Sequence, residues 1–160
     1  MDQIELFEKS PAYVEGWSSF FEMINSFEDI YLDKKEYLTG LHQGKPNTYV
    51  AEKRKVLDAI LASPKYQGIR VLLACYTQEY YEGSAFVLFL QDGRLFEVNG
   101  THCSCYGLEG QWEPELTTVQ DLRFRLSKGT LGTGYNNQDV FATKLATILN
   151  TLEAEIISLP

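Results

Sequence analysis

The chain begins and ends with stretches whose apolar residues recur at helical spacing, and between them lies a stretch with the pattern of β-strands. The first helical stretch carries a largely aromatic stripe made of Trp17, Phe20, Phe21, Ile24 and Phe27. Either the core or a partner could cover this stripe. A second helix is predicted from a cap at Asn47–Thr48 to about Ser63, where Pro64 ends it.

The pattern changes after Gly68. Asp92-Gly93 between two apolar runs is a strong hairpin signal, and Glu82-Gly83-Ser84 predicts an earlier turn. The middle run is apolar in both phases, so both of its faces should be covered, as in a central strand. We predict a three-stranded antiparallel meander over about 69–99, with its strands at residues 69–76, 85–91 and 94–99.

Helical spacing returns at the C-terminal end. Thr117–Thr118 can cap a short helix, and Asn136–Asn137 precede a longer one. The apolar stripe of the longer helix consists of Phe141, Leu145, Ile148, Leu149, Leu152 and Ile156. The glycine-rich stretch 129–137 matches neither a P-loop nor a dinucleotide fingerprint, and we expect a flexible connector with a helix cap there. The sequence therefore predicts an α+β fold, with the meander packed against N-terminal and C-terminal helices in a single globular domain, 1–160.

Composition supports a folded chain. Of its 160 residues 44% are hydrophobic, and no apolar run approaches the roughly 18–20 residues of a membrane span. Met1–Glu5 lack the features of a secretory signal, and the chain has three cysteines, an odd number. We therefore expect no membrane partner and a cytoplasmic location.

The net charge of −8 is unevenly distributed. Residues 1–33 hold eight acids and one base, whereas residues 34–66 hold three acids and seven bases. The overall excess of acids argues against direct binding to nucleic acid, which requires Lys and Arg to replace phosphate counterions. The basic run Lys53-Arg54-Lys55 lies on an amphipathic helix pattern, where we expect a solvated face.

Candidate chemistry is concentrated in residues 101–112. Together with Cys75, the side chains of His102, Cys103 and Cys105 form a Cys₃His set that could hold a structural zinc ion. The first and third strands of a meander lie about 9–10 Å apart, so the loop would have to fold back to close such a site. The alternative is that Cys75 is a small buried side chain and that the turn packs on the sheet. We therefore expect no cofactor, with zinc as the alternative.

A cysteine-dependent enzyme is a further alternative. Cys103 or Cys105 would be the nucleophile, and His102 or His42 would be the base. His102 adjoins Cys103 in the chain and is hard to align with it, and no separate orienting group stands out. We expect a protein that is not an enzyme.

Two segments carry a resemblance to a known family. Residues 75–87 and 99–114, including the string His-Cys-Ser-Cys-Tyr-Gly-Leu-Glu-Gly-Gln-Trp that begins at His102, resemble a family of small tailed-phage and prophage proteins of unassigned role. The resemblance implies no catalytic activity. It implies a protein of the host cytosol that occludes a host protein, including restriction and CRISPR defence enzymes, in some cases by imitating the charge of DNA.

We therefore expect a non-enzymatic protein-binding factor, an inhibitor or modulator of a host defence protein. Its contact surface should include the acidic N-terminal region and exposed aromatic side chains, since aromatic residues dominate binding hot spots. The residues expected at this surface are Tyr80, Tyr81, Tyr106, Trp112, Glu109 and Glu113.

Overall fold

A five-stranded sheet forms the centre of the protein. The structure, a computed structural model, describes residues 6–7 and 12–158, with the backbone alone for 155–158. The strands lie in the order β1-β4-β5-β6-β7, and β1 runs parallel to β4 whereas the other pairs are antiparallel. Their bounds are Tyr13–Glu15 (β1), Arg70–Tyr76 (β4), Glu82–Gln91 (β5), Arg94–Cys103 (β6) and Glu115–Leu116 (β7).

The α+β class is confirmed, but the predicted three-stranded antiparallel meander is wrong. Its three strands are the centre of a mixed five-stranded sheet, and a separate two-stranded hairpin pairs β2 (Leu41–His42) with β3 (Lys45–Pro46). The edge strands β1 and β7 have only three and two residues, too few to produce an alternating pattern in the sequence.

The ends of the central strands also differ from the prediction. β5 begins at Glu82, so the turn before it lies at Tyr80–Tyr81 and not at Glu82-Gly83-Ser84. β6 extends to Cys103, so His102 belongs to a strand and not to the loop that follows it.

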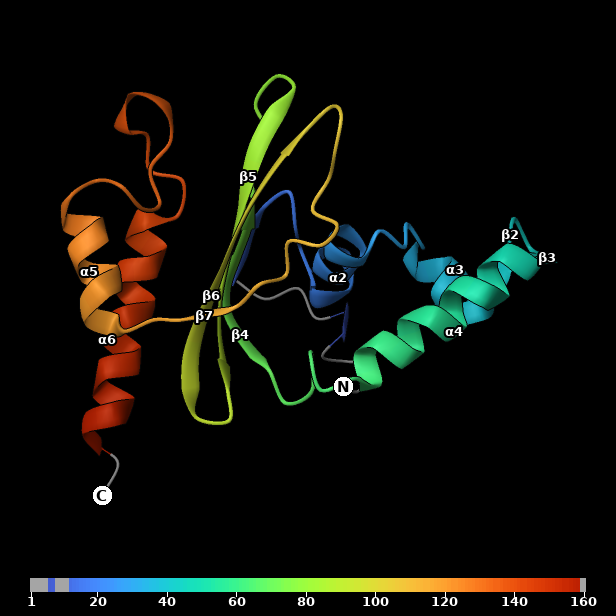
Figure 1. Cartoon of the computed structure of the whole chain (residues 1–160), viewed down its shortest axis with the longest axis horizontal. Helices are drawn as coiled ribbons and strands as arrows, with labels where there is room; N and C mark the ends of the chain where they lie inside the picture. The colour runs from blue at the N-terminus through green and yellow to red at the C-terminus, as the bar shows by residue number, and fades with distance from the viewer. Residues whose placement is uncertain (1–5, 8–11, 159–160) are drawn as a thin grey trace.

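Helices cover both faces of the sheet, which confirms the prediction made from the two apolar phases of the middle strand (Figure 1). Ala85, Val87 and Phe89 face the layer that contains α2, whereas Phe86 and Leu88 face α5 and α6. The helices are α2 (Phe20–Glu28), α3 (Lys34–Thr39), α4 (Thr48–Ala62), α5 (Val119–Ser127) and α6 (Ala142–Ser158), and a 3₁₀ turn spans Tyr135–Asn137. No helix within the described residues is long and apolar enough to cross a membrane.

The N-terminal aromatic stripe belongs to the core. Ser19 caps α2, and Trp17, Phe20, Phe21, Ile24 and Phe27 are all buried against the sheet. The C-terminal stripe is buried on the opposite face from Phe141 to Leu149, while the side chain of Ile156 lies outside the described residues.

A buried ion pair ties α5 to the sheet. Two N–H groups of the Arg125 guanidinium donate to the two carboxylate oxygens of Glu97, and the Asn99 amide donates to Glu97 Oε1 at 2.8 Å. Burial acts to raise the pKa of Glu97, but the hydrogen bonds from Arg125 and Asn99 outweigh it and hold the pKa below its usual value.

The segment formed by α3, the β2–β3 hairpin and α4 projects from the α2 layer, away from the sheet (Figure 1). We call residues 34–62 the arm. Its fully buried side chains are Val50 and Leu57, both on α4. The arm carries six bases and three acids, so the basic middle of the sequence forms one projecting element.

Candidate functional site

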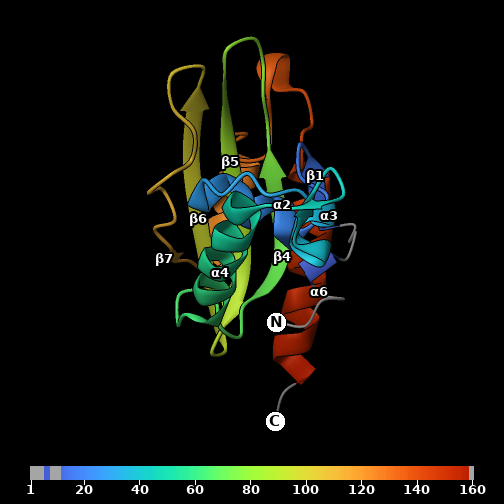
Figure 2. The same ribbon diagram turned by 90° about the vertical axis from the view of Figure 1, so that its right-hand side faces the viewer.

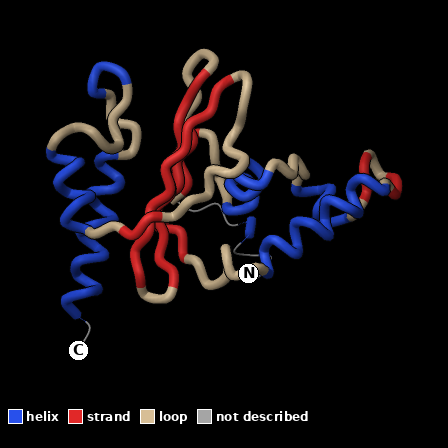
Figure 3. The backbone as a smooth tube through the Cα atoms, viewed as in Figure 1, coloured by secondary structure: helices blue, strands red, loops and turns tan. Residues whose placement is uncertain are grey.

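Three loops, counted with the first residues of β5 and the last residue of β6, lie at one end of the sheet: residues 77–84, 103–113 and 129–139. Figures 1 and 2 show that all three reach the same end and that the second loop then runs back beside β6 toward the middle of the sheet, and Figure 3 shows that loops form most of this end. Glu82 pairs with Cys103 across β5 and β6, so the first two loops are neighbours. Tyr80 of the first loop and Tyr135 of the third line one cleft. We call these three loops the tyrosine end.

The tyrosine end exposes four tyrosine side chains. Their exposed fractions are 95% for Tyr80, 78% for Tyr81, 54% for Tyr106 and 77% for Tyr135. The first three are among the residues expected at a binding surface, and the structure places them at one end. Tyr135 was not predicted, because only its proximity to Tyr80 in space connects it with the others.

The same loops are acidic. They contain five carboxylates and no Lys or Arg: Glu79, Glu82, Glu109, Glu113 and Asp139. Glu109 and Glu113, both expected at a binding surface, are exposed. Asp139 has a local role, since its side chain accepts a hydrogen bond from the Thr143 backbone N–H at 3.3 Å at the start of α6.

His102 braces the first loop. Its buried ring stacks on Tyr76, with 4.2 Å between ring centroids, and Nε2 lies 2.6 Å from the carbonyl oxygen of Thr77. A carbonyl only accepts, so Nε2 carries the proton, and in the neutral ring Nδ1 accepts from the Tyr76 hydroxyl at 3.3 Å. Burial and, after it, the charge of Glu109 raise the pKa of Tyr76 above its ordinary value.

Gly83 makes room for this brace. It pairs with His102 across β5 and β6, and a Cβ at Gly83 would lie 2.5 Å from His102 Nε2 and overlap the Thr77 carbonyl oxygen. The glycine that suggested a turn in the sequence therefore permits a close approach inside a strand.

The tip of the first loop is a tight turn. Backbone hydrogen bonds of 2.8 and 3.1 Å join Glu79 and Glu82 in both directions and enclose Tyr80 and Tyr81. Tyr80 has φ of 58°, a left-handed conformation that is unfavourable for a bulky side chain. The turn thus holds the most exposed tyrosine in a strained position, as is common at functional sites.

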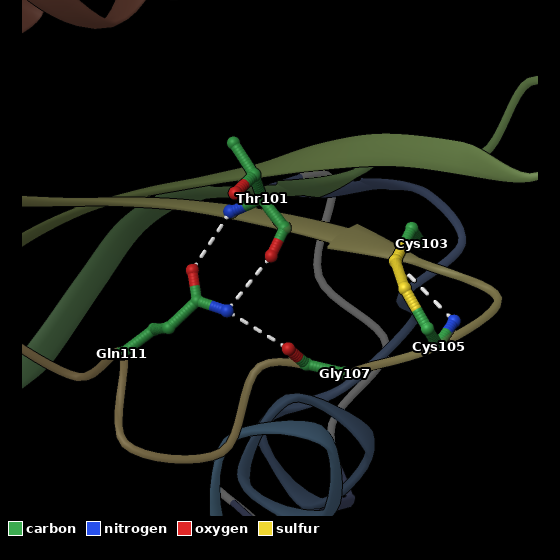
Figure 4. The surroundings of a disulfide bond; sticks show 5 residues. All are labelled: Thr101, Cys103, Cys105, Gly107 and Gln111. Atoms are coloured by element: carbon green, nitrogen blue, oxygen red, sulfur yellow. Dashed lines mark hydrogen bonds between the residues drawn. A yellow bond between two sulfur atoms is a disulfide. The ribbon is translucent and has the colours of Figure 1, made fainter.

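Covalent and hydrogen bonds brace the second loop (Figure 4). A disulfide joins Cys103 and Cys105, and the Cys103 N–H donates to the Tyr106 carbonyl at 3.0 Å. The Gln111 side chain accepts from the Thr101 N–H at 2.8 Å and donates to the Thr101 carbonyl at 2.7 Å. Gln111 therefore occupies the place of a neighbouring strand along the edge of β6.

The third loop is closed at its base. The Gly132 carbonyl accepts from the backbone N–H groups of Val140, Phe141 and Ala142 at 2.9 to 3.1 Å. Gly132 has φ of 78°, and a Cβ there would lie 2.7 Å from the Ala142 nitrogen. The expected connector is therefore an ordered loop that leads into α6.

The predicted zinc ligands are not brought together. Cys75 is buried on the α5–α6 face, where burial raises its pKa to about 12, and His102 lies on the opposite face. Cys103 and Cys105 are joined to each other. Within the described part of the chain, no three His, Cys, Asp or Glu side chains form a group that could hold a metal ion.

The predicted nucleophile and base are also apart. His102 Nδ1 contacts the Tyr76 hydroxyl, and Nε2 contacts the Thr77 carbonyl oxygen. Cys103 and Cys105 are bonded to each other, so neither is a thiolate. His42 lies in the arm, where its Nδ1 is 2.7 Å from Glu36 Oε2. The structure therefore brings neither histidine to a free thiol.

Trp112 was predicted to be exposed, and this prediction is wrong. The side chain is 7% exposed, and its ring contacts those of Phe27, Tyr66 and Phe89. The tryptophan anchors the second loop to the core while its neighbours remain at the surface.

Comparisons with protein-family models, with curated proteins and with solved structures find no match to this chain.

Proposed function

We propose that the protein is a non-enzymatic binding factor that docks the tyrosine end on a basic surface of another protein. The observation that carries this proposal is the gathering of four exposed tyrosines on three loops that contain five carboxylates and no Lys or Arg. Tyrosine supplies a large contact area at a low entropic cost, and for this reason antibody loops are rich in Tyr, Ser, Gly and Asn. In the three loops, 14 of 30 residues are of these four types.

Order within the loops supports the proposal. His102, Gln111 and the Gly132 carbonyl each fix the backbone of one loop through several contacts. A surface that is ordered before binding loses less conformational entropy on association. The tyrosines can therefore contribute more of their contact energy to affinity.

The charge of the tyrosine end favours a basic partner. Complementary potentials steer association and exclude partners of like charge. The resemblance to small phage and prophage proteins favours a host protein, and a defence enzyme with a basic DNA-binding surface fits this charge. Binding there would inhibit the enzyme by occluding the surface. The acidic N-terminal region, also expected at the contact, lies partly outside the described residues.

The experiment compares tyrosines at the two ends of the molecule. Wild-type protein, the double variant Tyr80→Ala/Tyr81→Ala and the control Tyr49→Ala are used to capture partners from the cells that naturally make the chain. Tyr49 is as exposed as Tyr135 but lies on the arm. Quantitative mass spectrometry should show a protein that the double variant retains at least about tenfold less than the wild type, while Tyr49→Ala retains it fully.

The capture should also weaken with added salt, because the proposed contact pairs charges at a solvent-exposed surface. Equal capture by the double variant and the wild type, or a loss caused by Tyr49→Ala alone, would contradict the proposal.

A further inference from the structure

We propose that the cleft between Tyr80 and Tyr135 receives an arginine side chain of the protein partner, an inference that rests on the proposed function. The cleft has a volume of about 610 Å³ and is lined by Glu79, Tyr80, Tyr135 and Gln138. Its walls come from the first and third loops of the tyrosine end, which rise side by side in Figures 1 and 2.

The lining residues match the chemistry of a guanidinium group. Arginine is planar, always charged and weakly hydrated, so it stacks on aromatic rings and pairs with carboxylates through two parallel N–H groups. Tyr80 and Tyr135 supply the rings, and Glu79 supplies the carboxylate. The Gln138 side chain adds a carbonyl acceptor for the remaining N–H groups.

Other side chains fit the cleft less well. A purely apolar group would leave the Glu79 carboxylate and the Gln138 amide without partners as water is displaced. An anionic group would meet Glu79, with Glu82 close by and no base in any of the three loops. Lysine could pair with Glu79 but cannot stack as a plane, so we expect it to bind more weakly than arginine.

Hydrogen bonds hold the backbone on both sides of the cleft. Glu79 is held by its paired backbone hydrogen bonds to Glu82. On the other side, the Gln138 N–H donates to the Tyr135 carbonyl at 3.2 Å, and the Gly134 N–H donates to the Gln138 carbonyl at 2.7 Å. Tyr135 and Gln138 thus belong to one closed turn, and the backbone on both sides of the cleft is ordered before any ligand arrives.

The test uses a peptide, so that it does not depend on knowing the partner. Acetyl-Gly-Ser-Arg-Ser-Gly-amide is titrated into protein with isotope-labelled tyrosine rings and followed by NMR. Matched peptides carry citrulline, which has the shape of arginine without its charge, or lysine. The ring resonances of Tyr80 and Tyr135 should shift with a dissociation constant of roughly 1–10 mM for arginine, more weakly for lysine and not for citrulline.

Variants assign the site. Glu79→Gln should weaken arginine binding about threefold to fivefold, and Tyr135→Ala should remove the shift at Tyr80. The control Glu113→Gln removes a carboxylate from another loop of the tyrosine end and should leave the affinity for the arginine peptide unchanged. Absence of shifts at Tyr80 and Tyr135, equal shifts with citrulline, or equal shifts at Tyr49 would each overturn the proposal.

The outcomes separate this inference from the proposed function. If Tyr80→Ala/Tyr81→Ala abolishes partner capture but the arginine peptide leaves both rings unshifted, the tyrosine end binds a partner and the arginine cleft is wrong. If the peptide binds as expected but capture does not depend on the tyrosine end, the cleft is right and the proposed function is wrong.

Discussion

The tyrosine end and the arm both expose tyrosines, but they present them in different ways. Tyr49 lies in the first turn of α4, on a helix that buries only Val50 and Leu57 and carries several bases. Tyr80 lies on a two-residue turn with a left-handed backbone, on a loop without a base. The exposed fraction is similar, whereas the rigidity and charge of the support differ. Under the proposed function, the ordered and acidic support of Tyr80, and not its exposure alone, distinguishes it as a contact residue from Tyr49.

The largest expected effect concerns packing at the glycines of the two regions. Gly83→Ala should lower the free energy of unfolding by about 3 kcal/mol, because its Cβ meets His102 and the Thr77 carbonyl. Gly44→Ala in the arm meets nothing within 4 Å and should lower it by about 1 kcal/mol, from its left-handed backbone alone. Urea unfolding measures both, and equal values would show that the tyrosine end is no more tightly braced than the arm.

The two histidines give the next largest contrast. His102→Ala removes a buried ring stack and leaves the Thr77 carbonyl without its donor, so we expect a loss of about 2–3 kcal/mol in unfolding free energy. His42→Ala removes an exposed contact with Glu36, and its effect should stay below about 1 kcal/mol. His102→Phe keeps an aromatic ring but lacks the hydrogen bond, so its loss of unfolding free energy should lie between those of His102→Ala and His42→Ala. An unchanged unfolding free energy in the His102→Ala variant would show that His102 does not brace the first loop.

The disulfide should have a smaller effect on stability and a local effect on order. Cys103→Ser/Cys105→Ser opens a loop of three residues, which corresponds to about 1–2 kcal/mol of unfolding free energy in the chain-entropy account. Backbone NMR order parameters should fall at residues 103–107 and stay constant around Tyr80 and Tyr135. Unchanged order at residues 103–107 would mean that hydrogen bonds alone hold the second loop.

The smallest expected change in unfolding free energy has opposite signs in the tyrosine end and in the arm. Tyr80→Gly relieves a left-handed backbone and should leave stability unchanged or raise it by up to about 1 kcal/mol. Tyr49→Gly weakens a helix and should lower stability by about 0.5–1 kcal/mol. Thermal unfolding of both variants provides the comparison. A clear loss for Tyr80→Gly would show that the turn is not strained.

The sequence predicted the longer elements because their apolar pattern reflects which faces are buried. The stripe from Trp17 to Phe27 reflects one buried face, and the double apolar phase of β5 reflects two. β1 and β7 could not be predicted, since two or three residues carry no period, and β1 joins the sheet through a pairing with the distant β4. Gly83 misled the turn assignment because a close approach and a turn can require the same residue.

The candidate site was predicted only in part. Tyr80, Tyr81 and Tyr106 were expected at the surface because aromatic residues dominate binding hot spots, and all three are exposed. The same reasoning placed Trp112 at the surface, whereas three rings from other elements bury it. Tyr135 has no local feature that connects it to Tyr80. The cleft between them arises from tertiary packing of two loops.

The most direct test of the central claim, that the tyrosine end is the binding surface, is photo-crosslinking from single positions. A benzophenone amino acid replaces Tyr81 in one variant and Tyr49 in another, and the cells that naturally make the chain are irradiated. A discrete covalent adduct of one partner protein from position 81, with none from position 49, is the predicted result. An adduct from position 49 with none from position 81 would contradict the account and assign binding to the arm.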